Sequence, residues 1–228
     1  MAQGQKPFYV AIGAVALIGI GWLAMRLAGG GPVSIPANVT VTEADTTGFR
    51  GYILGSETAT IEVTEYADYQ CPGCGAFATV QFPDLKARLI DTGKIRFRYR
   101  DFPLDGAHVH ARLAAHSAAC ANDQGKFWEM EDRIYQRQND WAMKGSALPI
   151  FEEIAKAVGL DTGAWKECMQ SAKYAGRIQA SLEEGSRAGV QYTPSFLIGG
   201  RIYSGLNADD IVRMVDSMIT AQAATPTP

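Results

Sequence analysis

The sequence lacks a strong excess of charge of either sign, because 24 acidic residues nearly balance 21 basic ones. A chain without a single-sign field has little attraction for nucleic acid, so we expect no nucleic-acid binding. Cysteine is also scarce, and four residues are too few for a small scaffold held together by disulfides. Apolar residues are not scarce: 228 residues with 47% hydrophobic content can bury one sizeable core.

One long uncharged run begins at Phe8, directly after Lys6 and Pro7. An α-helix needs roughly 20 apolar residues to cross a bilayer, so we predict a membrane anchor at 8–28, with residues 1–7 in the cytoplasm. A cleaved signal sequence is the alternative, although no small-x-small cleavage site follows the run. The next stretch, 29–55, opens with glycine and proline, which predicts a tether with a short strand near its end.

The rest of the chain alternates between strand and helix patterns, with one long helical block in the middle. The expected strands and helices are a strand at 59–67, a helix at 74–90, a strand at 95–99, helices between 106 and 189, a hairpin at 195–203 and a helix at 208–221. This order predicts an α/β fold, a mixed sheet flanked by helices with an inserted all-helical domain. The predicted boundaries are 56–105 and 190–222 for the two parts of the α/β domain, 106–189 for the insertion and 223–228 for a disordered tail.

Two cysteines lie close together, in Cys71-Pro72-Gly73-Cys74, where the first predicted strand leads into a helix. Unpaired N–H groups and the helix dipole favour an anion at a helix N-terminus, so we expect a lowered pKa for Cys71. A thiolate attacks disulfides, and Cys74, one turn along, is placed to resolve the mixed disulfide that forms. Pro72 fits an early helical position because it lacks only an N–H that would be unpaired there.

A zinc site is the competing interpretation of this pair. Zinc would need a second close ligand pair, whereas Cys120 and Cys168 are far apart in sequence, and His108, His110 and His116 have no acids at ligand spacing. We therefore expect no metal and no cofactor, and surface or capping roles for the histidines. Cys120 and Cys168 lie in two predicted helices of the insertion, where they form either a structural disulfide or two buried free thiols.

Four segments resemble the DsbA-like thiol oxidoreductases, in the order found in that family. The segments are Glu-Tyr-Ala-Asp-Tyr-Gln-Cys-Pro-Gly-Cys at 65–74, Arg-Asp-Phe-Pro-Leu at 100–104, Gln-Gly-Lys-Phe-Trp-Glu-Met at 124–130 and Gly-Val-Gln-Tyr-Thr-Pro-Ser-Phe-Leu-Ile-Gly-Gly at 189–200. The resemblance spans 49–220 and implies a thioredoxin-like domain interrupted by a helical one. It also implies that Thr193 and Pro194 form a cis-proline loop facing the active-site sulfur. Without the resemblance we would expect a trans peptide bond before Pro194, because most X-Pro bonds are trans.

Gly73 departs from the best-known pattern of that family, in which a histidine stands between the cysteines. Without this cation we expect a less acidic Cys71 and a less oxidising disulfide.

Glu65 precedes the dithiol on the predicted strand. If it alternates with Ile61 and Val63 it faces inward, where burial raises a carboxyl pKa and allows proton exchange with the resolving thiol. The resemblance implies that role for an acid at this position. A solvated glutamate at the strand edge is the alternative, which the sequence leaves open.

These features predict an extracytoplasmic thiol–disulfide oxidoreductase that introduces disulfides into reduced or partly unfolded exported proteins. The resemblance implies reoxidation by a quinone-linked membrane partner of the DsbB or vitamin K epoxide reductase kind. The anchor would hold the catalytic domain at the periplasmic or outer face of the cell membrane. Two alternatives stay open: a reductase or isomerase fed by a membrane electron donor, and a tethered peptide-binding or chaperone module with a vestigial dithiol.

Overall fold

A five-stranded sheet organises the part of the chain that the computed structural model describes, residues 33–224. Its strands are β1 (Tyr52–Gly55), β2 (Ile61–Ala67), β3 (Ile95–Asp101), β4 (Ser195–Ile198) and β5 (Arg201–Ser204). They lie in the order β1-β3-β2-β4-β5, with β2 and β3 parallel and the other neighbours antiparallel. The predicted mixed sheet is therefore confirmed.

Helices fill the connections between the strands. The helical segments are α2 (Glu43–Thr46), α3 (Pro72–Ala76), η1 (Phe77–Gln81), α4 (Phe82–Leu85), η2 (Lys86–Ile90), α5 (Ala111–Asn122), α6 (Phe127–Gln136), α7 (Gln138–Trp141), α8 (Leu148–Ala157), α9 (Thr162–Ser171), α10 (Ala175–Ala188) and α11 (Ala208–Ala224). Among residues 33–224, none is long and apolar enough to cross a bilayer. The predicted anchor at 8–28 and the cytoplasmic segment at 1–7 lie outside the described residues.

The connection from β2 to β3 is helical from Pro72 to Ile90 and carries the dithiol at its start. Two π-helical segments, η1 and η2, flank α4, and Pro83 occupies an early position of α4. The helix therefore continues past Pro83, because local π-helical turns absorb the missing N–H. Gly93, at a φ of +73°, lies in the turn that leads into β3.

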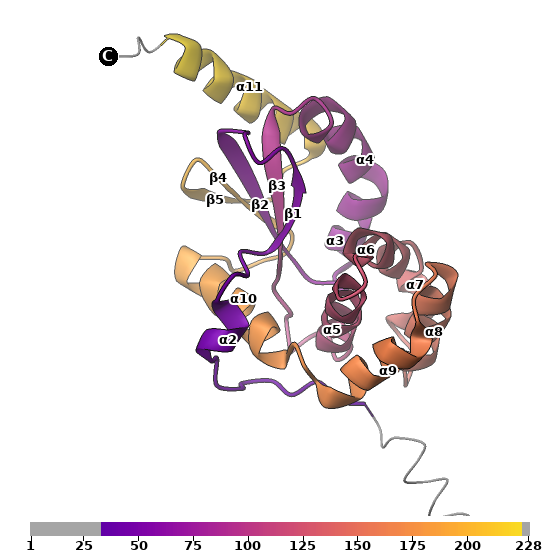
Figure 1. Cartoon of the computed structure of the whole chain (residues 1–228). Coiled ribbons are helices and arrows are strands. Elements are labelled where there is room, and N and C mark those ends of the chain that lie inside the picture. The colour runs from indigo at the N-terminus through magenta and orange to yellow at the C-terminus, as the bar shows by residue number, and fades with distance from the viewer. Residues whose placement is uncertain (1–32, 225–228) are drawn as a thin grey trace, which may run out of the picture. The chain divides into compact units, whose positions relative to one another are not determined.

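The two faces of the sheet are covered by different helices (Figure 1). Phe77 of η1 packs on Phe196 of β4, and Phe82 of α4 packs on Phe97 of β3, so the connection that follows the dithiol covers one face. On the other face, Glu184 of α10 accepts hydrogen bonds from side chains of β2 and β3. Helices α5 to α9 gather beside the end of the sheet at which β2 leads into α3.

The hairpin between β4 and β5 turns at Gly199 and Gly200, as the sequence predicted. Both glycines have positive φ angles, 57° and 80°, which suits a tight two-residue hairpin.

The segment predicted as a tether, 29–55, also contributes a strand to the sheet. Its last residues form β1, an edge strand that pairs with β3. Tyr52 of β1 is buried and stacks on Phe127 of α6, with ring centroids 3.5 Å apart. At the other end of the chain, α11 continues to Ala224, so two residues of the predicted tail at 223–228 are helical and the rest lie outside the described residues.

Candidate dithiol active site

Cys71 and Cys74 are free thiols in the first turn of α3. Cys71 is the residue that caps the helix, Pro72 occupies its first position, and the Gly75 N–H donates to the Cys71 carbonyl at 3.1 Å. Cys71 is partly exposed, whereas Cys74 is fully buried. The Cys71 sulfur is therefore accessible to another molecule, whereas the buried Cys74 sulfur is not.

The two thiols have pKa values moved in opposite directions. The pKa of Cys71 is lowered to about 5, chiefly by a hydrogen bond from the Cys74 thiol, with help from Thr193 and from the N–H groups of Cys74 and Gly73, and against the effect of burial. Burial raises the pKa of Cys74 well above its usual range, and the neighbouring Cys71 adds to this shift. At neutral pH, Cys71 is thus a thiolate beside a protonated Cys74.

The expectation that a histidine in place of Gly73 would make Cys71 more acidic stays a prediction. The groups that lower the pKa of Cys71 carry no charge, so a histidine cation is not required for a thiolate. A Cβ at Gly73 would lie 3.4 Å from the Cδ of Pro194 and 3.7 Å from the Cys71 sulfur, in ordinary contact. Position 73 therefore touches both the reactive sulfur and the loop that faces it.

That loop comes from the other part of the chain and carries Thr193 and Pro194, joined by a cis peptide bond as the resemblance implied. The Cys71 sulfur lies 3.3 Å from the Thr193 carbonyl oxygen, to which it donates a hydrogen bond when it is protonated. Tyr192, just before the loop, is exposed. An extended peptide that reaches Cys71 would thus lie beside the backbone of Thr193.

Glu65 faces inward, which decides between the two orientations that the sequence left open. Its side chain lies on the same face of β2 as Ile61 and Val63, and the residue is only 5% exposed. Burial raises its pKa to about 8, and once it is ionised its charge raises the pKa of Cys74. Glu65 is thus a protonated carboxyl at neutral pH, within electrostatic range of the resolving thiol.

Two glutamines that the sequence analysis did not identify hold the loop of the dithiol. The Gln138 amide, at the start of α7, donates to the carbonyls of Tyr69 at 2.7 Å and Cys71 at 2.9 Å. The Gln70 amide donates to the Ala142 carbonyl at 2.7 Å. Each contact joins residues about seventy positions apart, so no local pattern indicates it.

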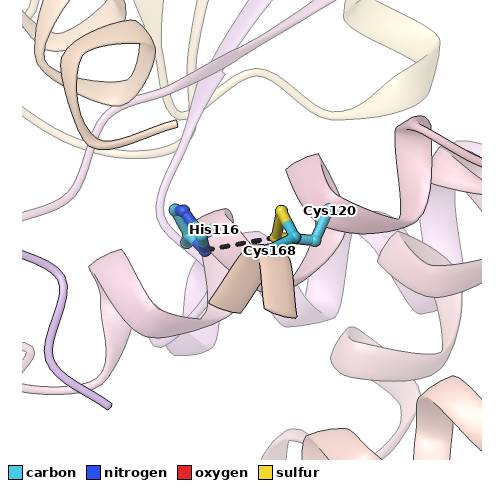
Figure 2. A group of neighbouring side chains, drawn as sticks. All are labelled: His116, Cys120 and Cys168. Carbon is cyan, nitrogen blue, oxygen red and sulfur yellow. Dashed lines mark hydrogen bonds between the residues drawn. A yellow bond between two sulfur atoms is a disulfide. The ribbon is translucent and has the colours of Figure 1, made fainter. Parts of the chain in front are cut away.

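Cys120 and Cys168 form a disulfide between α5 and α9, with Cα atoms 5.8 Å apart. Figure 2 shows the ring of His116 pointing toward it, and Nδ1 lies 3.4 Å from the Cys120 sulfur. Nε2 of His116 accepts a hydrogen bond from the Tyr174 N–H, so Nδ1 carries the proton of the neutral ring. These three side chains are close enough to hold a metal ion, but the sulfurs bond to each other and no thiolate remains.

The surface or capping role predicted for His116 is wrong. Its side chain is fully buried, and burial lowers its pKa to about 4. The cause is the alanine-rich α5, whose small side chains allow other elements to pack around it on several sides. His110 directly precedes α5, and its ring contacts the Lys144 carbonyl at 2.7 Å.

Known proteins share this architecture. A family model described as thioredoxin matches residues 49–217. The chain belongs to the thioredoxin family. DsbA of Chlamydia trachomatis superposes on it with a TM-score of 0.68 at 18% identity, covering 82% of this chain and all of that one. The predicted thioredoxin-like fold is thereby confirmed, and the chain resembles DsbA-type proteins in fold.

Two relatives by sequence differ widely in length. Na(+)/H(+) antiporter NhaA 3 of Salinispora tropica is 31% identical over 156 residues, which make up 68% of this chain but only 22% of the antiporter. A probable disulfide bond formation protein D of Bacillus anthracis is 28% identical over 167 residues, covering 72% of this chain and 76% of that protein. This thioredoxin-family chain thus spans less than a quarter of the first relative and most of the second.

Proposed function

We propose that this member of the thioredoxin family is a protein-disulfide oxidoreductase that introduces disulfides into reduced or partly unfolded exported proteins. The observation that carries the proposal is the partly exposed Cys71 at the start of α3 beside the buried Cys74, an arrangement that lowers the pKa of Cys71 to about 5. A thiolate stabilised in the dithiol form makes the disulfide form a stronger oxidant, because reduction then releases more free energy. The disulfide bond formation protein among its relatives agrees with this direction.

In the first step, a client thiolate attacks the Cys71 sulfur of the Cys71–Cys74 disulfide. A bond forms between the client and Cys71, and Cys74 leaves with the electron pair of the broken bond. Burial disfavours the Cys74 anion, so it takes a proton. Glu65, protonated below about pH 8, is the donor that we assign to this transfer.

In the second step, another client thiolate attacks the client sulfur of the mixed disulfide. The client gains a disulfide, and Cys71 leaves as a thiolate, which its low pKa favours. The enzyme is now a dithiol and needs an oxidant to return to its disulfide form. We assign this to a quinone-linked membrane partner of the DsbB or vitamin K epoxide reductase kind.

The proposed location is the extracytoplasmic face of the cell membrane, with the uncharged run at 8–28 as a single anchor. The Cys120–Cys168 disulfide supports this compartment, since structural disulfides persist where the surroundings are oxidising. After intact cells are treated with a membrane-impermeant reductant, a membrane-impermeant thiol reagent would label Cys71 if the proposal holds. Labelling only after the membrane is opened would place the dithiol on the other side.

Two measurements test the direction of exchange: the reduction potential of the Cys71–Cys74 disulfide, and the redox state of this pair in cells. Equilibration with glutathione should give a potential less negative than roughly −200 mV, toward the oxidising end of the family. Acid trapping of cells followed by alkylation should find Cys71 and Cys74 mostly as a disulfide. A mostly reduced pair with a potential near that of thioredoxin would instead identify a reductase, and full biological activity of Cys71→Ser would identify a binding module.

A further inference from the structure

Asp68, in the loop between β2 and α3, contacts both cysteines of the dithiol through its backbone. Its N–H donates to the Cys74 sulfur at 3.4 Å, and its carbonyl accepts from the Cys71 N–H at 3.1 Å. The Cys74 sulfur is buried, so water does not solvate it. A fixed N–H dipole in such a place stabilises a negative charge that develops on the sulfur.

The side chain of Asp68 is fully buried and holds that N–H in place. Its carboxylate accepts hydrogen bonds from the Gln70 N–H at 2.7 Å, the Leu104 N–H at 2.7 Å and Nδ1 of His108 at 2.8 Å. A carboxylate accepts, so Nδ1 of His108 carries a proton. Two of the three donors come from the segment between β3 and α5, which thereby clamps the loop before the dithiol.

This arrangement exceeds what a turn requires. Asp161 in the same chain caps α9 by accepting from the N–H groups of Gly163 and Ala164, and it remains exposed. Asp68 makes the equivalent local contact with Gln70 but is withdrawn from water and bound from a second segment as well. Burying a charge is costly unless several donors surround it, so the clamp around Asp68 needs a function besides the turn.

We propose that the Asp68 N–H stabilises the Cys74 thiolate during disulfide exchange, and that His108 is a positioning residue that holds this N–H through the Asp68 carboxylate. When a thiolate attacks Cys71, the Cys71–Cys74 bond breaks and its electron pair stays on the Cys74 sulfur, next to the N–H. In the reverse step the Cys74 thiolate attacks Cys71 and expels the other thiolate. The inference rests on the proposed exchange at Cys71 and Cys74, but not on its direction.

The test uses the mixed disulfide between Cys71 and glutathione, and measures how fast Cys74 releases glutathione. His108→Phe keeps a ring but removes the donor, while His108→Asn keeps an N–H near the place of Nδ1. His110→Ala is the matched control, since that histidine lies two residues further on and contacts the Lys144 carbonyl instead.

His108→Phe should release glutathione about tenfold more slowly, as expected for the loss of one hydrogen bond to a charged group. His108→Asn and His110→Ala should stay within about twofold of the wild-type rate, because a donor to Asp68 remains in both. A purely structural His108 would lower the unfolding temperature without slowing release. Release at the wild-type rate by folded His108→Phe would overturn the inference.

A second measurement needs no variant and applies even if His108→Phe does not fold. In the reduced wild-type protein, the amide proton resonance of Asp68 should shift as Cys74 ionises, following the thiolate absorbance of that cysteine. An Asp68 amide that does not respond to this ionisation would refute its role. If the wild-type protein releases no glutathione at all, the proposed function fails instead, so the two failures are distinct.

Discussion

Replacing Glu65 by glutamine should stabilise the protein by an amount that depends on pH. Burial raises the pKa of Glu65 from 4.5 to about 8, so the folded state keeps a proton that the unfolded state loses between these values. Below pH 4.5 the carboxyl is neutral in both states and costs nothing. As pH rises from 4.5 to about 8, the free energy of unfolding falls, because the folded state binds one more proton than the unfolded state in this range.

The magnitude follows from the width of that range. Each unit of pKa difference is worth about 1.4 kcal/mol, so the raised pKa of Glu65 costs about 3 kcal/mol of stability at pH 7 and about 5 kcal/mol once pH exceeds the folded pKa. Glu65→Gln has no proton to lose. Its advantage over the wild-type protein should therefore be close to zero near pH 4, about 3 kcal/mol at pH 7 and largest near pH 9.

Urea unfolding of the reduced proteins at these three pH values measures the difference. Glu62→Gln is the control, since Glu62 lies on the opposite face of β2 and pairs with Arg96 at 2.8 Å, at the margin of solvent. It should show no such gain with rising pH. A difference between Glu65→Gln and wild type that stays flat from acid to alkaline pH would refute the argument. The same variant should exchange disulfides more slowly, because Cys74 loses its proton donor.

Three further predictions concern other parts of the site and the core. Alkylation of Cys71 by iodoacetamide should be half-maximal near pH 5, and a midpoint near the ordinary pKa of cysteine would contradict the thiolate. Replacing Cys120 and Cys168 by alanine should cost ~4 kcal/mol in urea unfolding, from the entropy of a loop of 48 residues, and a loss under ~1 kcal/mol would contradict this. Gly185→Ala should cost about 1–3 kcal/mol, because the added Cβ would lie 2.7 Å from the ring of Phe102, and unchanged thermal unfolding would show that the ring yields freely.

Much of the fold was predictable because local patterns determine it. Alternation of apolar residues located β2 and β3, and the two glycines located the hairpin between β4 and β5. The helix after the dithiol was predicted at 74–90 from its helical pattern, and the structure starts it two residues earlier, at Pro72. Each of these features depends on residues within a few positions of one another, which is the range over which a sequence pattern carries information.

The orientation of Glu65 was not predictable, and β2 explains why. This strand is central, with neighbours on both sides, and Thr64 and Tyr66 on its other face are also buried. Alternation therefore does not separate an inner from an outer face, as it does for a strand with one side in water. The same reason applies to α5, where burial on several sides hides the position of His116.

The contacts that shape the site were hidden for a different reason. His108 reaches Asp68 across 40 positions, and Gln138 reaches Cys71 across 67. Single hydrogen bonds of this kind leave no periodicity in the sequence. They become visible only when the fold brings the segment after β3 and the start of α7 to the loop of the dithiol.

The opposed pKa values of the two cysteines bear on the direction of the reaction. A mixed disulfide on Cys71 can be attacked by Cys74, which returns the client to a thiol, or by a second client thiol, which oxidises the client. Attack by Cys74 requires it to lose a proton, and burial opposes that loss. Attack by the client expels Cys71, whose low pKa makes it a good leaving group. The asymmetry favours the route that leaves a disulfide in the client, and an Asp68 N–H that eased ionisation of Cys74 would set how often the other route competes.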